Sequence, residues 1–258
     1  ARRDQQTHRR RTRKMYTRAS HSTLNRNKTN MPAAHRQSAL IIGATGRTGL
    51  ECTRHFASHQ TDPAVHAFCR DADKLDDKDK ALCTSIVQGD ARSPVDLERA
   101  LTETRTDVVV LSIGNGDSVK KSNIRTASAY ALVQVMEKPQ FEHVHTVVVS
   151  SVGAGSSRII VGGVLGKLIS LHLRHVLADH TGQENAFRSL RHRTTVVRAT
   201  NLTDDEATGK LVCFQDREKP PSSKTDRADL AAWIVGEVCS GTKLVGGRVV
   251  NVTGIKEQ

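Results

Sequence analysis

One stretch of the chain constrains the fold more than any other. Residues 39–50 read Ala-Leu-Ile-Ile-Gly-Ala-Thr-Gly-Arg-Thr-Gly-Leu. The apolar run from Leu40 to Ile42 predicts a short strand buried on both faces, and the apolar spacing from Leu50 onward predicts an amphipathic helix. A buried strand, a turn with three glycines and a helix, in this order, are typical of the unit that binds the diphosphate of a dinucleotide.

Each glycine of this turn has a predicted task. Gly43 allows a tight turn out of the strand, Gly46 lets a pyrophosphate approach the backbone, and Gly49 lets the helix pack on the strand. The free N–H groups at the start of the helix then face the phosphates. The predicted cofactor contacts of the turn are Gly43, Thr45, Gly46, Arg47, Thr48 and Gly49. Because the spacing is Gly-x-x-Gly-x-x-Gly, a plain glycine-rich loop is the alternative, which the flanking strand and helix disfavour.

The rest of the chain alternates between strand patterns and helix patterns. Further strands are predicted at residues 65–69, 84–88, 107–113, 146–149, 194–198 and 248–252, and helices at 94–101, 124–137, 164–190 (in one or two pieces) and 226–239. Residues 201–224 are polar and contain Pro220 and Pro221, which predicts loops on the substrate side. The alternation predicts an α/β fold with a doubly wound, mostly parallel sheet, formed by one domain over residues 39–258.

Residues 1–38 differ from everything that follows them. They hold eleven Lys or Arg and one acid, so +10 of the formal net charge of +12 lies in this segment. With almost no large apolar residues, it is predicted to be a disordered basic tail. Arg-rich, Ser/Thr-rich and acid-poor sequence is also typical of a transit peptide for mitochondria or plastids. The favoured alternative is that Met31 is the natural start and that the protein is cytoplasmic.

The composition argues against several classes of partner. Because the basic excess is confined to the tail, nucleic-acid binding by the folded part is not expected. No apolar run approaches the roughly 18 residues of a membrane span, so no membrane partner is expected. The five cysteines are scattered without a Cys-x-x-Cys pair, which predicts small buried side chains and neither disulfides nor a metal site. The expected partner is a small-molecule substrate or another protein, and the oligomeric state is left open.

Two arginines favour NADP over NAD as the bound nucleotide. Arg70 stands where the second predicted strand ends, and Arg47 lies within the glycine turn, so either could contact a 2′-phosphate. One charge-assisted hydrogen bond is worth roughly 1.5–3 kcal/mol, which corresponds to a preference of roughly ten- to hundredfold. NAD is the alternative if Asp71 binds the ribose and Arg70 is a solvated charge. Farther along, Asp90 could accept a hydrogen bond from the adenine amine or cap the next turn.

Taken in order, these motifs resemble those of a known family. They are the Gly-Ala-Thr-Gly-Arg-Thr-Gly turn, Arg70 at a strand end, Gly89-Asp90, Ser150-Ser151, and Glu184 ahead of Thr-Val-Val-Arg198. From residue 39 onward the chain is similar to the atypical short-chain dehydrogenases/reductases with an NAD(P)H-binding Rossmann fold, which include flavin reductase-like and NmrA-like proteins. The contacts that this resemblance implies are Arg70 with the 2′-phosphate, Asp90 with the adenine, Ile113 and Gly114 with the ribose side, and Ser150 and Ser151 with the nicotinamide.

The chain departs from the better-known short-chain dehydrogenases at one place. They carry Tyr-x-x-x-Lys after the serine strand, where the lysine lowers the phenol pKa so that the tyrosine can donate a proton. Here Tyr16 lies in the tail and Tyr130 precedes the serine strand. His180 stands where the lysine is expected and could relay a proton near neutral pH, acting with Ser150 and Ser151 as the catalytic residues. A solvated helix histidine is the favoured interpretation of His180.

The missing tyrosine leaves two functions open. Reduction of a planar conjugated substrate, such as a flavin or a quinone-like compound, needs positioning more than a strong acid, because solvent can supply the proton. The alternative is a non-catalytic NADP-binding redox sensor or assembly factor that acts through a protein partner.

Overall fold

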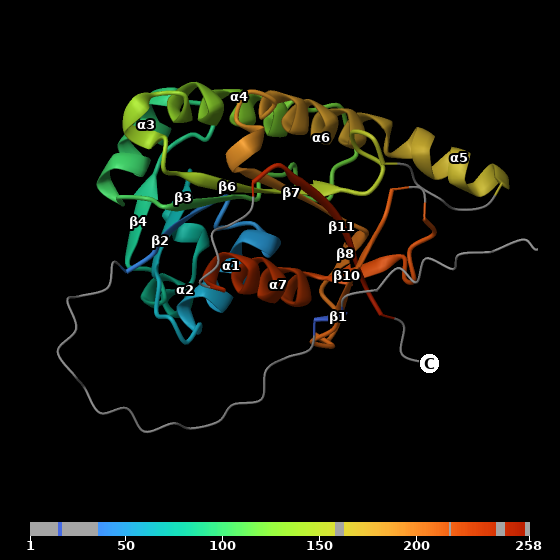
Figure 1. The fold of residues 1–258 in the computed structure, drawn as a ribbon, viewed down its shortest axis with the longest axis horizontal. Coiled ribbons are helices and arrows are strands. Elements are labelled where there is room, and N and C mark those ends of the chain that lie inside the picture. Colours follow the sequence, from blue (N-terminus) through green and yellow to red (C-terminus); the bar gives the residue numbers. More distant parts are fainter. Residues whose placement is uncertain (1–14, 17–35, 158–162, 217, 241–245, 256–258) are drawn as a thin grey trace, which may run out of the picture.

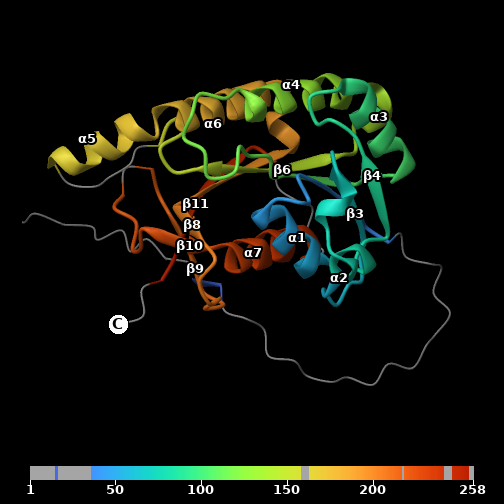
Figure 2. The ribbon, with the colours of Figure 1, turned by 180° about the vertical axis from the view of Figure 1, so that it is seen from behind.

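A computed structural model describes residues 15–16, 36–157, 163–216, 218–240 and 246–255 (Figures 1 and 2). The tail predicted over residues 1–38 lies outside this described part, apart from Met15–Tyr16 and residues 36–38. Met15–Tyr16 (β1) pairs antiparallel with Leu211–Phe214 (β9). Ser38, the last residue of the predicted tail, is the first residue of the strand Ser38–Ile42 (β2).

In the described part of the chain, nine strands form one mostly parallel sheet, in the order β1-β9-β11-β7-β6-β5-β2-β3-β4. The strands not yet introduced are Ala64–Cys69 (β3), Ser85–Gln88 (β4), Val108–Leu111 (β5), His145–Ser151 (β6), Thr194–Ala199 (β7) and Arg248–Gly254 (β11). All neighbours from β4 to β11 pair parallel, and β9 pairs antiparallel with β11 and β1. The connections change direction between β2 and β5, which is the topological switch point of a doubly wound fold. The predicted fold class is confirmed.

Helices cover both faces of the sheet. They are Arg47–Ala57 (α1), Asp77–Ala81 (α2), Pro94–Glu103 (α3), Ile124–Met136 (α4), Gly163–His172 (α5), Arg174–Ala186 (α6) and Arg227–Cys239 (α7). Figure 1 shows α3, α4 and α6 on one face and α1 and α7 on the other, with α5 extending past the end of the layer. The helical stretch predicted over residues 164–190 is therefore two successive helices.

The segment predicted to be rich in loops, residues 201–224, also contains short strands. Asn201–Thr203 (β8) and Lys224–Asp226 (β10) form a separate parallel pair, and β9 joins the main sheet. Leu211 at the start of β9 belongs to the buried core. The sequence did not predict these strands, because a four-residue strand between polar segments is too short to produce a clear hydrophobic period.

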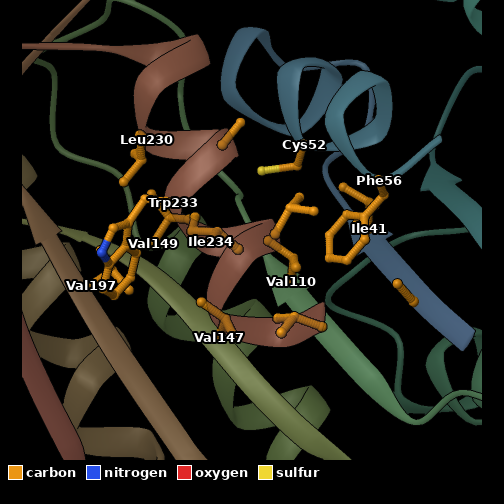
Figure 3. Close-up of a cluster of buried hydrophobic side chains, with 14 of the residues drawn as sticks. Ile41, Cys52, Phe56, Val110, Val147, Val149, Val197, Leu230, Trp233 and Ile234 are labelled. Carbon is orange, nitrogen blue, oxygen red and sulfur yellow. The ribbon is translucent and has the colours of Figure 1, made fainter. Parts of the chain in front are cut away.

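Two buried hydrophobic clusters join the layers, one on each face of the sheet. Every residue of β2 is buried; Leu40 and Ile42 belong to the cluster beneath α3 and α4, and Ile41 to the cluster beneath α1 and α7. Figure 3 shows the latter, with Phe56 of α1 and Trp233 of α7 packed over strand residues. The first and the last helix of the described residues, α1 and α7, therefore share one core.

The structure also shows where the cysteines lie and whether metal-binding groups or membrane-spanning helices occur among the described residues. The five cysteines form no disulfide in the described part of the chain, and Cys52, Cys69 and Cys239 are buried. Among the residues described, no group of three or more His, Cys, Asp or Glu is arranged to hold a metal ion. Within the same ranges, no helix combines the length and the apolar character needed to cross a bilayer.

Candidate functional site

The predicted site residues collect at one edge of the sheet. Because β4, β3, β2, β5 and β6 are parallel neighbours, their carboxyl ends meet at this edge. The predicted residues at or just after these strand ends are, in the same order, Asp90, Arg70, Gly43, Ile113 with Gly114, and Ser150 with Ser151. His180 lies on α6, outside this row. In open α/β sheets, ligands bind in the crevice at this edge, next to the switch point.

The glycine turn is held by close backbone packing. Gly43 has a φ of +93°, and a Cβ at this position would overlap the carbonyl oxygen of Ser112 and lie 2.9 Å from its carbon. A Cβ at Gly49 would likewise overlap the carbonyl oxygen of Gly43, with the carbon at 2.8 Å. At Gly46 the nearest atom would be 3.2 Å away. Gly43 and Gly49 are thus required by the turn and by the packing of α1, whereas Gly46 leaves its outer side open.

The first turn of α1 is suited to an anion. Gly46 is the N-cap and supplies no side-chain hydrogen bond, and the first turn contains no acidic residue. Thr45 is partly exposed and Thr48 is buried, so the side chains leave the turn accessible. The unpaired N–H groups and the positive end of the helix dipole favour a phosphate here. These features fit the diphosphate of a dinucleotide.

Arg47 extends from this turn toward two carboxylates. Its guanidinium pairs with Asp117, in the loop after β5, and with Asp204, after β8, at 2.9 Å. The hydrogen bond that Arg47 donates to Asp204 raises the pKa of Arg47. These side chains are about half exposed or more, and such pairs are worth about 0–1 kcal/mol. The ion pairs therefore do not prevent Arg47 from turning to a phosphate, as the sequence predicts.

The two residues proposed for the ribose end differ in their surroundings. Arg70 is exposed directly after β3. The carboxylate of Asp71 accepts a hydrogen bond from Asp73 N at 3.1 Å and caps the short 3₁₀ helix Ala72–Lys74 (η1). Because Asp71 has this structural task, Arg70 is the freer of the two to meet a 2′-phosphate.

Asp90 forms a local turn. Its Oδ1 accepts a hydrogen bond from Arg92 N at 2.9 Å, and its Oδ2 pairs with Arg92 Nη2 at 2.6 Å. The hydrogen bond from the Arg92 side chain lowers the pKa of Asp90 to about 2. The structure therefore contains the turn-capping arrangement that the sequence left open, and an adenine contact by Asp90 stays a prediction.

The strand predicted over residues 107–113 ends earlier than expected, because β5 stops at Leu111. Ile113 and Gly114 therefore lie in the loop just after the strand. Ser112 N still donates to the carbonyl of Ile42 at 2.9 Å, and the carbonyl of Ser112 lies where a Cβ on Gly43 would be. A Cβ at Gly114 would lie 3.2 Å from Arg125 Nη2, so a buried guanidinium of α4 packs beneath this glycine. No local sequence pattern singles out Arg125, because its position depends on the packing of α4 against the sheet.

The two serines at the end of β6 have different environments. Ser150 is buried, and its hydroxyl donates to Glu184 Oε1 of α6 at 2.7 Å. Ser151 is partly exposed, and its hydroxyl donates to the carbonyl of the adjacent Val152 at 3.2 Å. The sequence marked Glu184 and Arg198 only as parts of a pattern. In the structure they form an ion pair at 2.6 Å next to Ser150.

His180 is neither solvated nor poised to titrate near neutral pH. It is buried between α6 and α4, with Arg125 and Asp179 as its charged neighbours. Burial, with a further contribution from Arg125, lowers the pKa of His180 to about 3. Both interpretations of the sequence are corrected here, because the side chain faces the helix–helix interface and is a neutral imidazole at physiological pH. It stays a candidate only for a role without protonation.

The buried imidazole predicts a pH-dependent stability. The unfolded chain protonates His180 below about pH 6.5 and the folded chain only near the lowered pKa of about 3. Between these values the unfolded state binds more protons, so the free energy of unfolding should fall by up to about 1.4 kcal/mol per pH unit of acidification. Urea unfolding at several pH values measures how the free energy of unfolding depends on pH. This dependence should be weaker for His180→Gln than for the wild type, and it should equal that of the wild type for His172→Gln, which changes an exposed histidine. Equal slopes for His180→Gln and the wild type would contradict the assignment.

Fold and site together define a dinucleotide-binding protein of the Rossmann class. The family model described as NAD(P)H-binding matches residues 43–238, and the chain belongs to this family. The predicted resemblance and the predicted class of cofactor are thereby confirmed. Comparison with curated protein sequences gives no match.

Several solved structures share the fold. ChuY, an anaerobillin reductase from Escherichia coli O157:H7, matches with a TM-score of 0.64 and 19% identity over 85% of this chain and 98% of its own. A short-chain dehydrogenase/reductase from Veillonella parvula DSM 2008, in complex with NADP, has a TM-score of 0.64 and 15% identity over 84% and 94%. A putative NAD-dependent epimerase/dehydratase from Bacillus halodurans has a TM-score of 0.64 and 19% identity over 84% and 93%. At these identities the likeness concerns the fold.

Proposed function

We propose that this protein is an NADPH-dependent reductase of a planar conjugated substrate, such as a flavin or a quinone-like compound. The observation that carries the proposal is the arrangement of the site. The helix α1 follows a glycine turn and has no side-chain cap, and the partly exposed Ser151 lies at the end of a strand two places away in the sheet. No tyrosine–lysine pair accompanies Ser151 in the described chain, and His180 is buried. Such a site can align two reactants but has no strong proton donor.

The proposed chemistry follows from this set of groups. A hydride would pass from the reduced nicotinamide to an electrophilic atom of the conjugated acceptor, and water would supply the proton that completes the two-electron reduction. Ser151 would donate a hydrogen bond to an acceptor oxygen as negative charge develops there. One of the proteins that share the fold is described as an anaerobillin reductase, so this fold can hold such a reaction.

Steady-state oxidation of NADPH with FMN and with simple quinones tests the proposal. Turnover that depends on both reactants is expected. Nucleotide binding without turnover for any acceptor would reject the reductase and favour the second candidate, a non-catalytic NADP-binding sensor or assembly factor that acts through a protein partner. The absence of a strong proton donor near Ser151 is the observation that favours this second candidate.

The preference for NADPH is expected to depend on Arg70. Replacing Arg70 with alanine removes an exposed charge directly after β3 and should weaken NADPH binding by roughly ten- to hundredfold, because a charge-assisted hydrogen bond is worth roughly 1.5–3 kcal/mol. NADH, which lacks the 2′-phosphate, should bind the variant and the wild type equally. Fluorescence titration with both nucleotides measures the effect, and Arg188→Ala, an exposed arginine beyond the end of α6, is the control. Equal losses for NADPH and NADH would contradict the assignment.

A further inference from the structure

A row of polar side chains crosses three neighbouring strands beneath α6. Ser150 of β6 lies in register with Arg198 of β7, and Arg198 with Asn251 of β11. Val149 and Val197 belong to the cluster beneath α1 and α7, so the next residues along the strands, Ser150 and Arg198, point to the α6 face. All three polar residues are buried. The charge of Arg198 in this buried position requires a partner.

Glu184 of α6 is that partner. Arg198 Nη2 donates to Glu184 Oε2 at 2.6 Å and Arg198 Nε to Oε1 at 2.9 Å, and only 3% of the arginine and 9% of the glutamate side chain are exposed. Two parallel hydrogen bonds of this kind fix the planes of both groups. The hydroxyl of Ser150 donates to the same Oε1. The proton of Ser150 is therefore committed to Glu184.

The loop that follows the serine strand rests on this ion pair. Gly155 has a φ of +57°, and a Cβ there would overlap Arg198 Nη2 and Glu184 Oε2. Ser156 Oγ accepts a hydrogen bond from Arg198 Nη1 at 3.1 Å and donates to Asp216 Oδ2 at 2.8 Å. Arg198 thus connects the serine strand, its loop and the segment after β9.

We propose that Glu184 and Arg198 are the positioning pair of the reductase site and that they give the two serines different tasks. Ser150 is an internal donor to Glu184, and Ser151 presents its hydroxyl to the substrate. The bond from Ser151 to the carbonyl of Val152, at 3.2 Å, is one that a substrate oxygen can replace. This inference rests on the proposed function and names the residues that hold its catalytic hydroxyl in place.

The first test removes both charges together, as Glu184→Leu with Arg198→Met, so that no charge is left buried alone and the chain can stay folded. The matched control is Glu237→Leu with Arg248→Met, which removes a more exposed ion pair of 2.7 Å between α7 and β11. The site variant should bind NADPH like the wild type and lose about hundredfold in kcat with little change in KM, because misplacement by about 1 Å can cost that much. The control should keep its kcat. A site variant with wild-type kcat would overturn the proposal.

A second measurement does not depend on turnover. Gly153 N donates to Ser157 Oγ at 2.8 Å and Gly155 N to Thr181 Oγ1 at 3.0 Å, so hydrogen–deuterium exchange reports the order of this loop. Exchange over residues 152–157 should become faster in the site variant and stay unchanged in the control. If the wild type reduces no acceptor but exchange is faster in the site variant, the proposed reductase function is rejected, whereas the role of Glu184 and Arg198 in ordering the loop is supported. Unchanged exchange would overturn the positioning pair.

The single serine variants test the division of tasks. Ser151→Ala should lower kcat by about a hundredfold, as loss of a donor to a developing negative charge does. Ser150→Ala should lower kcat less, since its hydroxyl acts through Glu184. Equal losses, or a larger loss for Ser150→Ala, would overturn the assignment.

Discussion

Alanine in place of Gly49 is expected to abolish useful dinucleotide binding. Its Cβ would overlap the carbonyl oxygen of Gly43 and lie 2.8 Å from its carbon, so the turn and the first turn of α1 must move apart. Losing two charge-assisted hydrogen bonds to the diphosphate, at roughly 1.5–3 kcal/mol each, corresponds to a loss of affinity of roughly 10²- to 10⁴-fold. Titration calorimetry with NADPH measures this loss.

A second glycine provides the control for this variant. A Cβ at Gly236 of α7 would meet no atom within 4 Å. Gly236→Ala should therefore leave NADPH binding unchanged and add about 0.5–1 kcal/mol to the free energy of unfolding, because alanine favours the helix. Wild-type affinity in Gly49→Ala would show that the turn is not the diphosphate site, and every redox function proposed for the chain would then lose its basis.

Removing one partner of the buried ion pair should have the largest effect on stability. In Arg198→Leu the carboxylate of Glu184 keeps the hydrogen bond from Ser150 but loses its counter-charge in a buried site. Breaking such a pair costs about 3–5 kcal/mol. Urea unfolding of the variant should show a loss of this size.

The more exposed ion pair again supplies a comparison. Arg248 and Glu237 have 37% and 21% of their side chains exposed, so Arg248→Leu should cost no more than about 1 kcal/mol. Similar losses in Arg198→Leu and Arg248→Leu would mean that Glu184 is not buried as described.

The sequence predicted the fold because the relevant signals are local. The apolar run of β2, the glycines after it and the helix period of α1 all lie within residues 38–57. The same local signals gave the order of strands and helices, and parallel pairing then brought Arg70, Ile113 and Ser151 to one edge. Such reasoning requires no knowledge of which helix packs on which side chain.

The side-chain partners could not be predicted, because they join segments that are distant in sequence. Glu184 and Arg198 come from a helix and a strand, and Asp216 meets Arg198 from a loop. The environment of His180 likewise depends on how α4 packs against α6, where the carboxylate of Asp179 accepts hydrogen bonds from the first turn of α4. Whether a residue is buried in such an interface depends on how the helices pack together. The spacing of apolar residues along α6 alone could therefore not distinguish an exposed His180 from a buried one.

The shared core of α1 and α7 has a consequence for synthesis of the protein. Phe56 of α1 and Trp233 of α7 are far apart in the sequence, yet they belong to one cluster (Figure 3). Until the ribosome has released α7, the apolar side of α1 has no complete cover, and a nascent chain with this surface exposed is prone to aggregate or to engage chaperones. The glycine turn is translated before α7, but α1, which follows it, can reach its final stability only after α7 has left the ribosome.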